Sequence, residues 1–421
     1  MIAGHKSLKY MKIITLVLPL VLSVQAAGQE QEAAGDFTPR VEHPAFKPGT
    51  GPEIWIDEAH HNFHTRGGRY RAFGDLLEAD GFQVAASVQP FTSGSLDGCD
   101  ILVISNALSE QDGEDWALPS ASAFTPEEIA VVRDWVDQGG GLWLIVDHMP
   151  MPGCNNELAA AFGVSFSNGY AMVPGHQGAL VFRREDGGLA DHPITWGARA
   201  DEKIGTVASF TGSAFRADPS FEPLMILPPD TESWLTASAG DFTDDTPRED
   251  VGGWLQGGVQ EVGRGRIAVF GEAAMFTAQV ARDGDAEVRF GFIAPAAPDN
   301  QQFLLNVARW LAPGSTLDSF SSVPVNRDWT FSRFTRPRYP AGASAADRSR
   351  PVRVRVAVFV KSDGTAGQTI LLGNSGAAAF GEAVLEAAAD WTVEWQGDPG
   401  EGRWIMTDHV FRDDEEGGGE R

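Results

Sequence analysis

Histidine and carboxylate side chains follow several apolar runs of this 421-residue chain, at the points where predicted strands end. Because the carboxyl ends of parallel strands meet at one edge of a sheet, we expect these side chains to converge. Imidazoles and carboxylates are the ligands that zinc and manganese commonly take in proteins. The sequence therefore predicts a divalent-metal site with Asp57, His60, His64, Asp147 and His148 as ligands, and with Glu272 or Glu58 as the base toward a bound water.

Two other interpretations of these residues stay open. Aspartates directly after strands often cap the next turn, and loop histidines often bond to backbone carbonyls, so the cluster can be purely structural. Alternatively, the pocket holds a small polar ligand without a metal. In that case the free N–H groups near a predicted helix start at Arg66-Gly67-Gly68-Arg69 suit a carboxylate or phosphate. The predicted ligand-binding residues are then Arg66, Arg69 and Asn106.

Apolar runs of strand length alternate with amphipathic segments of helix length in the first part of the chain. Strands are predicted at 54–56, 82–88, 101–105 and 142–146, and helices at 70–81 and 125–138. Thr125, Pro126 and Glu128 form the pattern of a helix start with a capping box. This alternation predicts an α/β fold with a doubly wound, mostly parallel sheet of the flavodoxin type.

The middle of the chain has a different pattern. Residues 163–250 contain short periodicities and many turns, which predicts irregular and antiparallel additions to the sheet. Gly263-Arg264-Gly265 lies between two apolar runs and predicts a hairpin. The segment 300–311 is an amphipathic helix that completes the domain.

The segments 54–58, 139–148 and 265–272, closed by the helix at 300–311, resemble the class I glutamine-amidotransferase-like superfamily, in particular its uncharacterised exported branches. The resemblance covers residues 51–313 and implies an amidotransferase-like α/β domain. Members that hydrolyse glutamine carry a nucleophilic cysteine in a G-x-C-x-G elbow after the strand that ends here at Val146. Here Asp147-His148-Met149-Pro150 follows that strand, and Cys154 lies further on without the glycines. The resemblance therefore implies a degenerate domain without the cysteine elbow.

A second, smaller domain is predicted at 337–412. Val352 to Val360 alternate with polar residues, Asp363-Gly364 is a hairpin turn, and a helix at 378–389 precedes Trp391. With Tyr339-Pro340 and Asn374-Ser375-Gly376, these segments resemble the C-terminal domain of TonB-type energy transducers. The resemblance implies a small α+β domain that binds an extended peptide by adding a strand at a sheet edge. Energy transduction is not expected, because a membrane anchor and a long proline-rich segment are not seen.

The charges of the chain indicate which partners to expect. Asp and Glu number 58 against 32 Lys and Arg, and this net charge of -26 argues against nucleic acid as a partner. Between Arg327 and Arg355, in contrast, eight Arg stand against two Asp. That basic surplus can dock on the first domain, meet an acidic partner, or form a solvated strand face. A protein or peptide partner is expected at the C-terminal domain.

The N-terminal segment has the pattern of an export signal. Lys6, Lys9 and Lys12 precede the apolar run 13–24, and the small residues around Ala26 suit a signal peptidase. Because the run is too short to span a bilayer, we expect a periplasmic protein cleaved near Ala26, with no stable membrane span. Two free thiols are expected, since Cys99 and Cys154 flank parallel strands at opposite ends.

The predicted order along the chain is a signal peptide at 1–26, a linker at 27–50, the α/β domain at 51–313, a linker at 314–336, the C-terminal domain at 337–412 and a disordered acidic tail at 413–421. The sequence favours an exported ligand-binding or scaffolding protein whose C-terminal domain docks a peptide. The alternative is a metal-assisted hydrolase with its site at the strand ends of the α/β domain. The two hypotheses differ in whether a divalent metal, zinc or manganese, is bound.

Overall fold

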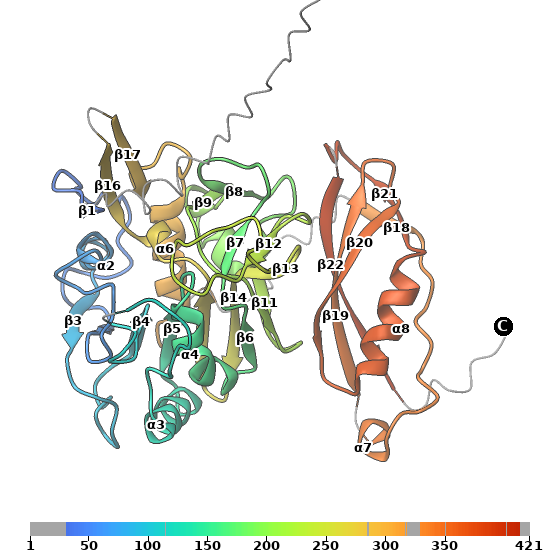
Figure 1. Ribbon diagram of the computed structural model, residues 1–421, viewed down its shortest axis with the longest axis horizontal. Coiled ribbons are helices and arrows are strands. Elements are labelled where there is room, and N and C mark those ends of the chain that lie inside the picture. Colours follow the sequence, from blue (N-terminus) through green and yellow to red (C-terminus); the bar gives the residue numbers. More distant parts are fainter. Residues whose placement is uncertain are drawn as a thin grey trace, which may run out of the picture.

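The protein folds into two parts that lie side by side, an α/β domain and a smaller C-terminal domain (Figure 1). The computed structural model describes residues 31–113, 115–283, 286–315, 317, 329–349, 351–400 and 402–412. The predicted signal peptide and the predicted acidic tail lie outside the described residues. Within the described part of the chain, no helix has the length and apolar composition needed to cross a membrane.

A nine-stranded sheet forms the centre of the α/β domain. Its order is β3 (Gln83–Ser87), β2 (Glu53–Asp57), β4 (Ile101–Ser105), β5 (Gly141–Ile145), β15 (Gly265–Phe270), β14 (Leu255–Val262), β10 (Phe215–Ala217) and β6 (Val164–Phe166), and β11 (Glu222–Ile226) also pairs with β14. The strands from β3 to β15 are parallel, and those from β14 onward pair antiparallel. The sheet is therefore mixed, and the prediction of a mostly parallel sheet holds for the five strands from β3 to β15.

Helices cover both faces of this sheet. Helices α2 (Arg71–Ala79) and α6 (Asn300–Leu311) share one apolar core with the sheet, and α3 (Pro126–Asp137) and α4 (Met151–Ala160) share the other. Strand β5 shows why two cores form, because Trp143 and Ile145 point into the first and Leu142 and Leu144 into the second. A strand that is apolar on both faces requires cover on both sides.

The helix boundaries follow local signals in the sequence. Thr125 caps α3, and its side chain and that of Glu128 form the reciprocal capping box that the sequence predicts. Gly139, with a φ of 124°, follows the end of the helix at Asp137. Helix α6 also has the predicted limits.

The middle of the chain adds short antiparallel sheets, as predicted. One is formed by β7 (Tyr170–Met172), β12 (Glu232–Trp234) and β13 (Arg248–Asp250), and one by β8 (Leu180–Arg183) and β9 (Thr206–Ser209). A third, outside the range for which additions were predicted, joins β1 (Glu32–Ala33), β16 (Ala278–Asp283) and β17 (Ala286–Gly291). Short helical segments are α5 (Pro193–Trp196), η1 (Ala200–Glu202) and η2 (Ala274–Phe276). Strand β1 lies within the segment predicted as a linker, because it pairs with the edge of β16.

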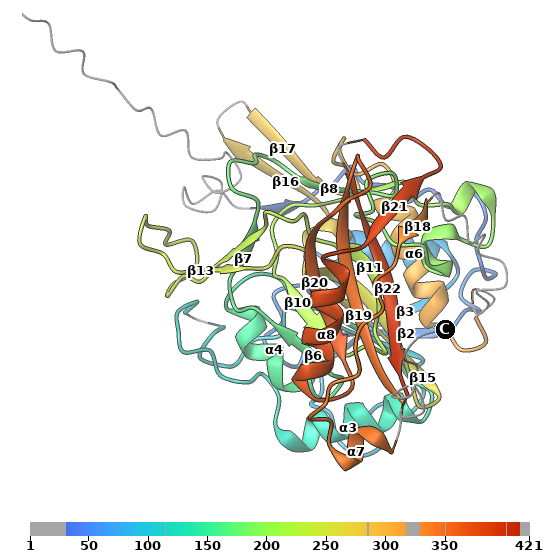
Figure 2. The ribbon, with the colours of Figure 1, turned by 90° about the vertical axis from the view of Figure 1, so that its right-hand side faces the viewer.

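The C-terminal domain is a three-stranded sheet with one long helix on it. The sheet has the order β20 (Ala366–Asn374), β19 (Val352–Lys361), β22 (Gly402–Phe411), and α8 (Ala378–Ala388) covers its outer face (Figure 2). A short helix, α7 (Ala345–Arg348), precedes the sheet. Strand β18 (Trp329–Arg333) pairs with β21 (Thr392–Trp395), although its residues fall in the predicted linker at 314–336. It belongs to this domain because Phe331 packs against Trp391.

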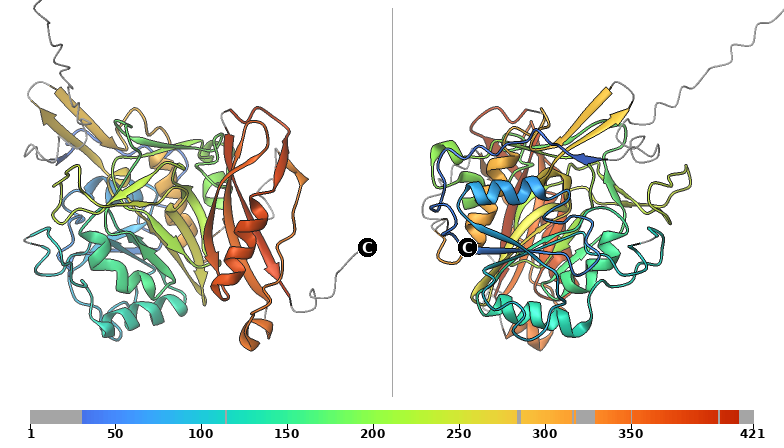
Figure 3. Two further views of the ribbon diagram at one scale, coloured as in Figure 1. Left: turned by 45° about the vertical axis from the view of Figure 1, so that its right-hand side comes forward. Right: turned by 90° about the vertical axis from the view of Figure 1, so that its left-hand side faces the viewer.

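The opposite face of the C-terminal sheet packs against the α/β domain (Figure 3). Trp404 and Leu372 lie in the same apolar core as Phe221 of the α/β domain. Gly253 lies at this contact with a φ of 71°, which favours glycine, and a Cβ there would approach Cδ1 of Ile370 to 2.0 Å.

Arg355 of β19 takes part in this contact. Its guanidinium pairs with Asp408 at 2.7 Å and donates a hydrogen bond to the carbonyl of Phe221. Of the three interpretations of the basic surplus, docking on the first domain applies to this residue.

Both cysteines are free thiols, as predicted. Cys99 precedes β4 and Cys154 lies in α4, and both side chains are buried. Burial raises the pKa of both thiols, that of Cys154 to about 12, so both are protonated near neutral pH.

Candidate functional site

A small cavity lies at the carboxyl edge of the parallel strands. It has a volume of about 40 Å³, which is room for about three water molecules. Its polar lining consists of Gln31, His64, Asn106, Asp147, His148, Thr211 and Gln279. Its apolar lining includes Phe63, Trp116, Met151, Phe210, Ala274 and Phe290.

The lining residues come from loops that follow successive strands. His64 follows β2, Asn106 follows β4, and Asp147 and His148 follow β5, which are adjacent parallel strands. Gln279 and Phe290 come from the β16–β17 hairpin, on the other side of the cavity. The strand ends thus bring together four of the residues that the sequence singled out.

A chain of hydrogen bonds fixes the state of His64. The backbone N–H of Asp147 donates to Oδ1 of Asn106 at 2.8 Å, so the amide N–H of Asn106 faces Nδ1 of His64 at 3.2 Å. Nδ1 therefore accepts, and the ring proton lies on Nε2. Burial, and then the charge of Arg69, lower the pKa of His64 to about 3. His64 is a neutral donor at this cavity.

His148 is held in the other tautomer. Its Nδ1 lies 2.9 Å from the carbonyl of Met149, which can only accept, so Nδ1 carries the proton. The backbone N–H of His148 donates to Oδ1 of Asp147 at 2.8 Å. The imidazole also stacks on Tyr170, with ring centroids 4.2 Å apart. The ring is therefore fixed from two sides.

Glu272, predicted as a catalytic base, lies next to this cavity rather than in its lining. Its carboxylate accepts hydrogen bonds from the N–H groups of Ala274 and Met275, at 2.8 and 2.7 Å, and so stabilises the start of η2. The side chain is fully buried. Burial and the nearby charge of Asp147 raise the pKa of Glu272 well above its usual value.

Asp57 and His60 form a separate buried cluster with Glu128. Nδ1 of His60 lies 2.9 Å from Asp57, and Nε2 lies 3.0 Å from Glu128 of α3. The ring lies between Phe91 and Phe124, with centroids 4.8 and 4.6 Å away. Because both ring nitrogens face carboxylates, the protonated ring can donate to both, and this favours the imidazolium form of His60. The five predicted metal ligands thus divide between two places.

The remaining predicted residues stabilise the loop before α2. Glu58 accepts a hydrogen bond from the backbone N–H of Arg66 at 2.7 Å. The Arg66 guanidinium pairs with Asp75 and Glu78 of α2, each at 2.9 Å. Arg69 lies over the ring of Phe63, with its guanidinium carbon 4.1 Å from the centroid. Asn106 is thus the member of the predicted ligand-binding set that lines the cavity.

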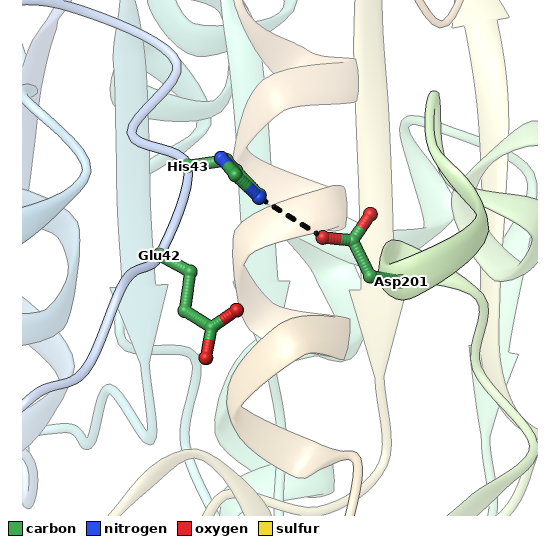
Figure 4. Close-up of side chains that lie close together, drawn as sticks. All are labelled: Glu42, His43 and Asp201. Atoms are coloured by element: carbon green, nitrogen blue, oxygen red, sulfur yellow. Dashed lines mark ion pairs between the residues drawn. The ribbon is translucent and has the colours of Figure 1, made fainter.

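Three exposed side chains elsewhere lie close enough to share a cation. Glu42, His43 and Asp201 form, within the described residues, the one group of three such ligand atoms that lie within 4.8 Å of one another (Figure 4). His43 already pairs with Asp201 at 3.3 Å, and Arg199 also pairs with Asp201 at 3.2 Å. These ion pairs account for the cluster as a solvated surface feature. A metal at the strand ends stays a prediction.

Several residues of the cavity carry no recognisable signal in the sequence. Trp116 and Phe210 lie in loops, and Gln279 and Phe290 lie on a hairpin far along the chain. Glu128 was identified only as a capping residue, which it also is. One signal in the sequence could have identified the apolar walls of the cavity, namely apolar residues that stand next to the polar residues after a strand. Phe63, next to His64, is an example.

Comparison with known proteins found solved structures but no family. No family model matches the chain, and no curated protein matches it. It is similar to the N-terminal domain of mmIFT52, with 12% identity over 61% of this chain and 96% of the other, at a TM-score of 0.44. It is also similar to a ThuA-like protein from Bacteroides uniformis, with 12% identity over 66% of this chain and 96% of the other, at a TM-score of 0.37. The TonB C-terminal domain of Pseudomonas aeruginosa is similar with 22% identity over 21% of this chain and 87% of the other, at a TM-score of 0.16.

Proposed function

We propose that this chain is an exported binding protein that holds a small polar ligand in the cavity at the strand ends. The observation that carries the proposal is the fixed polar network of Asp147, Asn106 and His64 in a concave site with aromatic walls. Preformed cavities that combine apolar walls with a few oriented polar groups are typical of small-molecule sites. Export rests on the N-terminal pattern, and sequencing of the mature chain is expected to begin at Ala27.

The position of Cys154 argues against a nucleophilic role in this function. The thiol is buried in α4 and is not part of the cavity lining. Burial raises its pKa to about 12, so the nucleophilic thiolate is scarce near neutral pH. The turn after β5 instead carries Asp147 and His148, which line the cavity. Binding therefore explains the site better than glutamine hydrolysis.

Filling the cavity should abolish ligand binding. The Ala274→Phe variant places a ring in the cavity wall, so small polar compounds that raise the melting temperature of the native chain are expected to lose that effect. Ala198→Phe, at an exposed position, serves as the control. A thermal-shift screen of small polar compounds at millimolar concentration provides the measurement. Shifts that persist in Ala274→Phe, or a screen without any shift, would contradict the proposal.

A metal-assisted hydrolase is the second candidate. It is favoured by His148, whose Nδ1–H is held by a carbonyl, as is common for a histidine that binds metal through Nε2. Elemental analysis of chain purified without chelator distinguishes the two functions. Stoichiometric zinc or manganese that is lost in the Asp147→Ala, His148→Ala double variant would establish the hydrolase site, and equal near-zero content in both would remove it.

The second part of the proposal is that the C-terminal domain docks an extended peptide along β20. This strand lies at an edge of its three-stranded sheet. It borders a groove of about 550 Å³ between the two domains, which is also lined by Leu385 of α8 and Ala217 of β10. A strand edge beside a groove suits a peptide that adds a strand and inserts side chains.

Truncation of the groove wall tests this docking. Leu385→Ala is expected to weaken the binding of a peptide selected from a display library by about tenfold. Apolar contacts next to the added strand carry much of the affinity for such a peptide. Glu386→Ala, exposed on the same helix, is the matched control and is expected to bind as the native chain does. Calorimetric titration measures both, and equal affinities for the two variants would contradict docking at this groove.

A further inference from the structure

We infer that the ligand of the cavity carries a primary ammonium group next to a hydroxyl or carbonyl oxygen, as in a small amino alcohol. The inference rests on the proposed small-ligand function and names the chemical class of the ligand. It follows from the orientation of three polar groups at the cavity, Gln279, Asp147 and His64.

The amide of Gln279 presents an oxygen that accepts no hydrogen bond from the described residues. The hydroxyl of Thr277 donates its proton to the carbonyl of Ala274 at 2.7 Å, so it can only accept from the Nε2 group of Gln279, which lies 2.8 Å away. This arrangement fixes the amide, and Oε1 is the remaining polar atom. Gln279 is 1% exposed, and within the described residues its Oε1 accepts no hydrogen bond. A buried acceptor of this kind calls for a donor, and a ligand in the cavity can supply one.

Asp147 adds a negative charge to the same cavity. Its side chain is 7% exposed, and its Oδ1 accepts the backbone N–H of His148. No ion pair of Asp147 occurs in the part of the chain that the structure describes. Because a buried carboxylate without a cation is costly, a positively charged group in the cavity stabilises it. A primary ammonium group has three donors, enough for both Asp147 and Gln279.

The walls of the cavity suit a cation as well. Phe63, Trp116, Phe210 and Phe290 line it, and aromatic faces attract ammonium groups through their quadrupoles. Arg69 is not among the lining residues, and its guanidinium lies over the ring of Phe63. No Lys or Arg occurs among the described residues that line the cavity, so we expect the ligand to bring the cation.

His64 accounts for the neighbouring oxygen of the ligand. Asn106 fixes the proton of His64 on Nε2, which makes this nitrogen a donor. An ammonium group cannot accept a hydrogen bond. The ligand therefore needs a second polar atom, an oxygen, that accepts the hydrogen bond from Nε2 of His64. A two-carbon amino alcohol has four non-hydrogen atoms, which suits a cavity of about 40 Å³.

Three small compounds with one shared hydroxyl group test the inference on the full chain. Ethanolamine carries an ammonium group, ethylene glycol a neutral hydroxyl and glycolate a carboxylate. Ligand-observed NMR titrations at constant ionic strength are expected to give a dissociation constant on the order of 1 mM for ethanolamine, and at least about tenfold weaker binding of the other two. Asp147→Asn is expected to weaken the binding of ethanolamine by about tenfold to about a hundredfold.

Matched variants separate a binding effect from a folding effect. Asp241→Asn makes the same charge change at an exposed position of the loop that packs on Tyr170 through Phe242, and is expected to bind ethanolamine as the native chain does. Gln279→Met removes the amide oxygen Oε1 and is expected to weaken the binding of ethanolamine about tenfold. Circular dichroism of each variant monitors folding, and Gln279→Met serves where Asp147→Asn fails to fold.

The outcomes distinguish this inference from the proposed function. If ethylene glycol or glycolate binds and ethanolamine does not, the amine class is wrong while the binding function stands. If ethanolamine binds equally to the native chain, Asp147→Asn and Gln279→Met, its site is elsewhere and the inference is overturned. If none of the three compounds binds and the thermal-shift screen is also empty, both the inference and the binding function are overturned.

Discussion

Replacing Asp57 with alanine is expected to lower the free energy of unfolding by about 3 to 5 kcal/mol, because it removes one partner of a buried ion pair. Asp57 is 0% exposed and accepts hydrogen bonds from Ala59, His60 and Asn62, at 3.1, 2.9 and 3.0 Å. Without the carboxylate, the donors that remain buried lose their acceptor. Chemical denaturation followed by circular dichroism measures the loss.

The control for this variant is Asp75→Ala. Asp75 is 33% exposed and pairs with Arg66 at 2.9 Å, so its loss is expected to cost no more than about 1 kcal/mol. An equally small loss for Asp57→Ala would contradict the assignment of a buried His60 ion pair that organises the loop after β2.

The same cluster makes stability depend on pH. Burial opposes the charge on His60, but the hydrogen bonds and charges of Asp57 and Glu128 outweigh it and raise the pKa of the ring above 6.5. Its contribution is therefore fully present below 6.5 and is lost as the pH rises through the raised pKa. His64 and His192, both with a pKa of about 3, do not titrate in this range. In His60→Gln, the fall in stability as the pH rises above 6.5 is expected to be smaller than in the native chain.

Replacing Arg309 with alanine is expected to have a similarly large effect, about 3 to 5 kcal/mol of unfolding free energy. Arg309 of α6 pairs with Asp80 at 2.6 Å and with Glu202 at 2.8 Å, and these carboxylates are 0% and 7% exposed. The substitution leaves two buried carboxylates without their cation. It also disconnects α6 from the turn after α2 and from η1.

Arg289→Ala is the matched control for Arg309. Arg289 is 41% exposed and pairs with Glu287 at 2.9 Å and with Asp36 at 3.7 Å, so we expect a change of less than about 1 kcal/mol. Calorimetric melting of both variants provides the comparison. Similar melting temperatures for the two variants would show that the buried network adds little to stability.

The local patterns of the sequence predicted much of the fold. The capping box of α3, the hairpin at Gly263 and the limits of α6 depend on neighbouring residues alone, and each is found. The antiparallel additions predicted for 163–250 are found in β10 and β6, but with β14 and β11 they make up more of the central sheet than the prediction of a mostly parallel sheet implied. Pairing direction depends on where a strand returns to the sheet, which short-range periodicity does not record.

The candidate site could be predicted only in part. His64, Asn106, Asp147 and His148 meet because parallel strands end at one edge, and that rule is visible in the order of apolar runs. His60 was predicted at the same site, yet it pairs with Glu128, which lies 68 residues away along the chain. The partner of His60 was therefore decided by the packing of helix α3, which brings Glu128 next to the ring.

The sequence by itself determined which chemical groups stand at the strand ends, because strand periodicity and the polar residues after each strand are local properties. Tertiary structure alone decided which of these groups share a cavity and what surrounds them. Gln279 and Phe290 reach it from a hairpin more than a hundred residues beyond Asp147. Such contacts join segments distant in sequence, so the chemistry of the cavity depends on the packing of the whole domain.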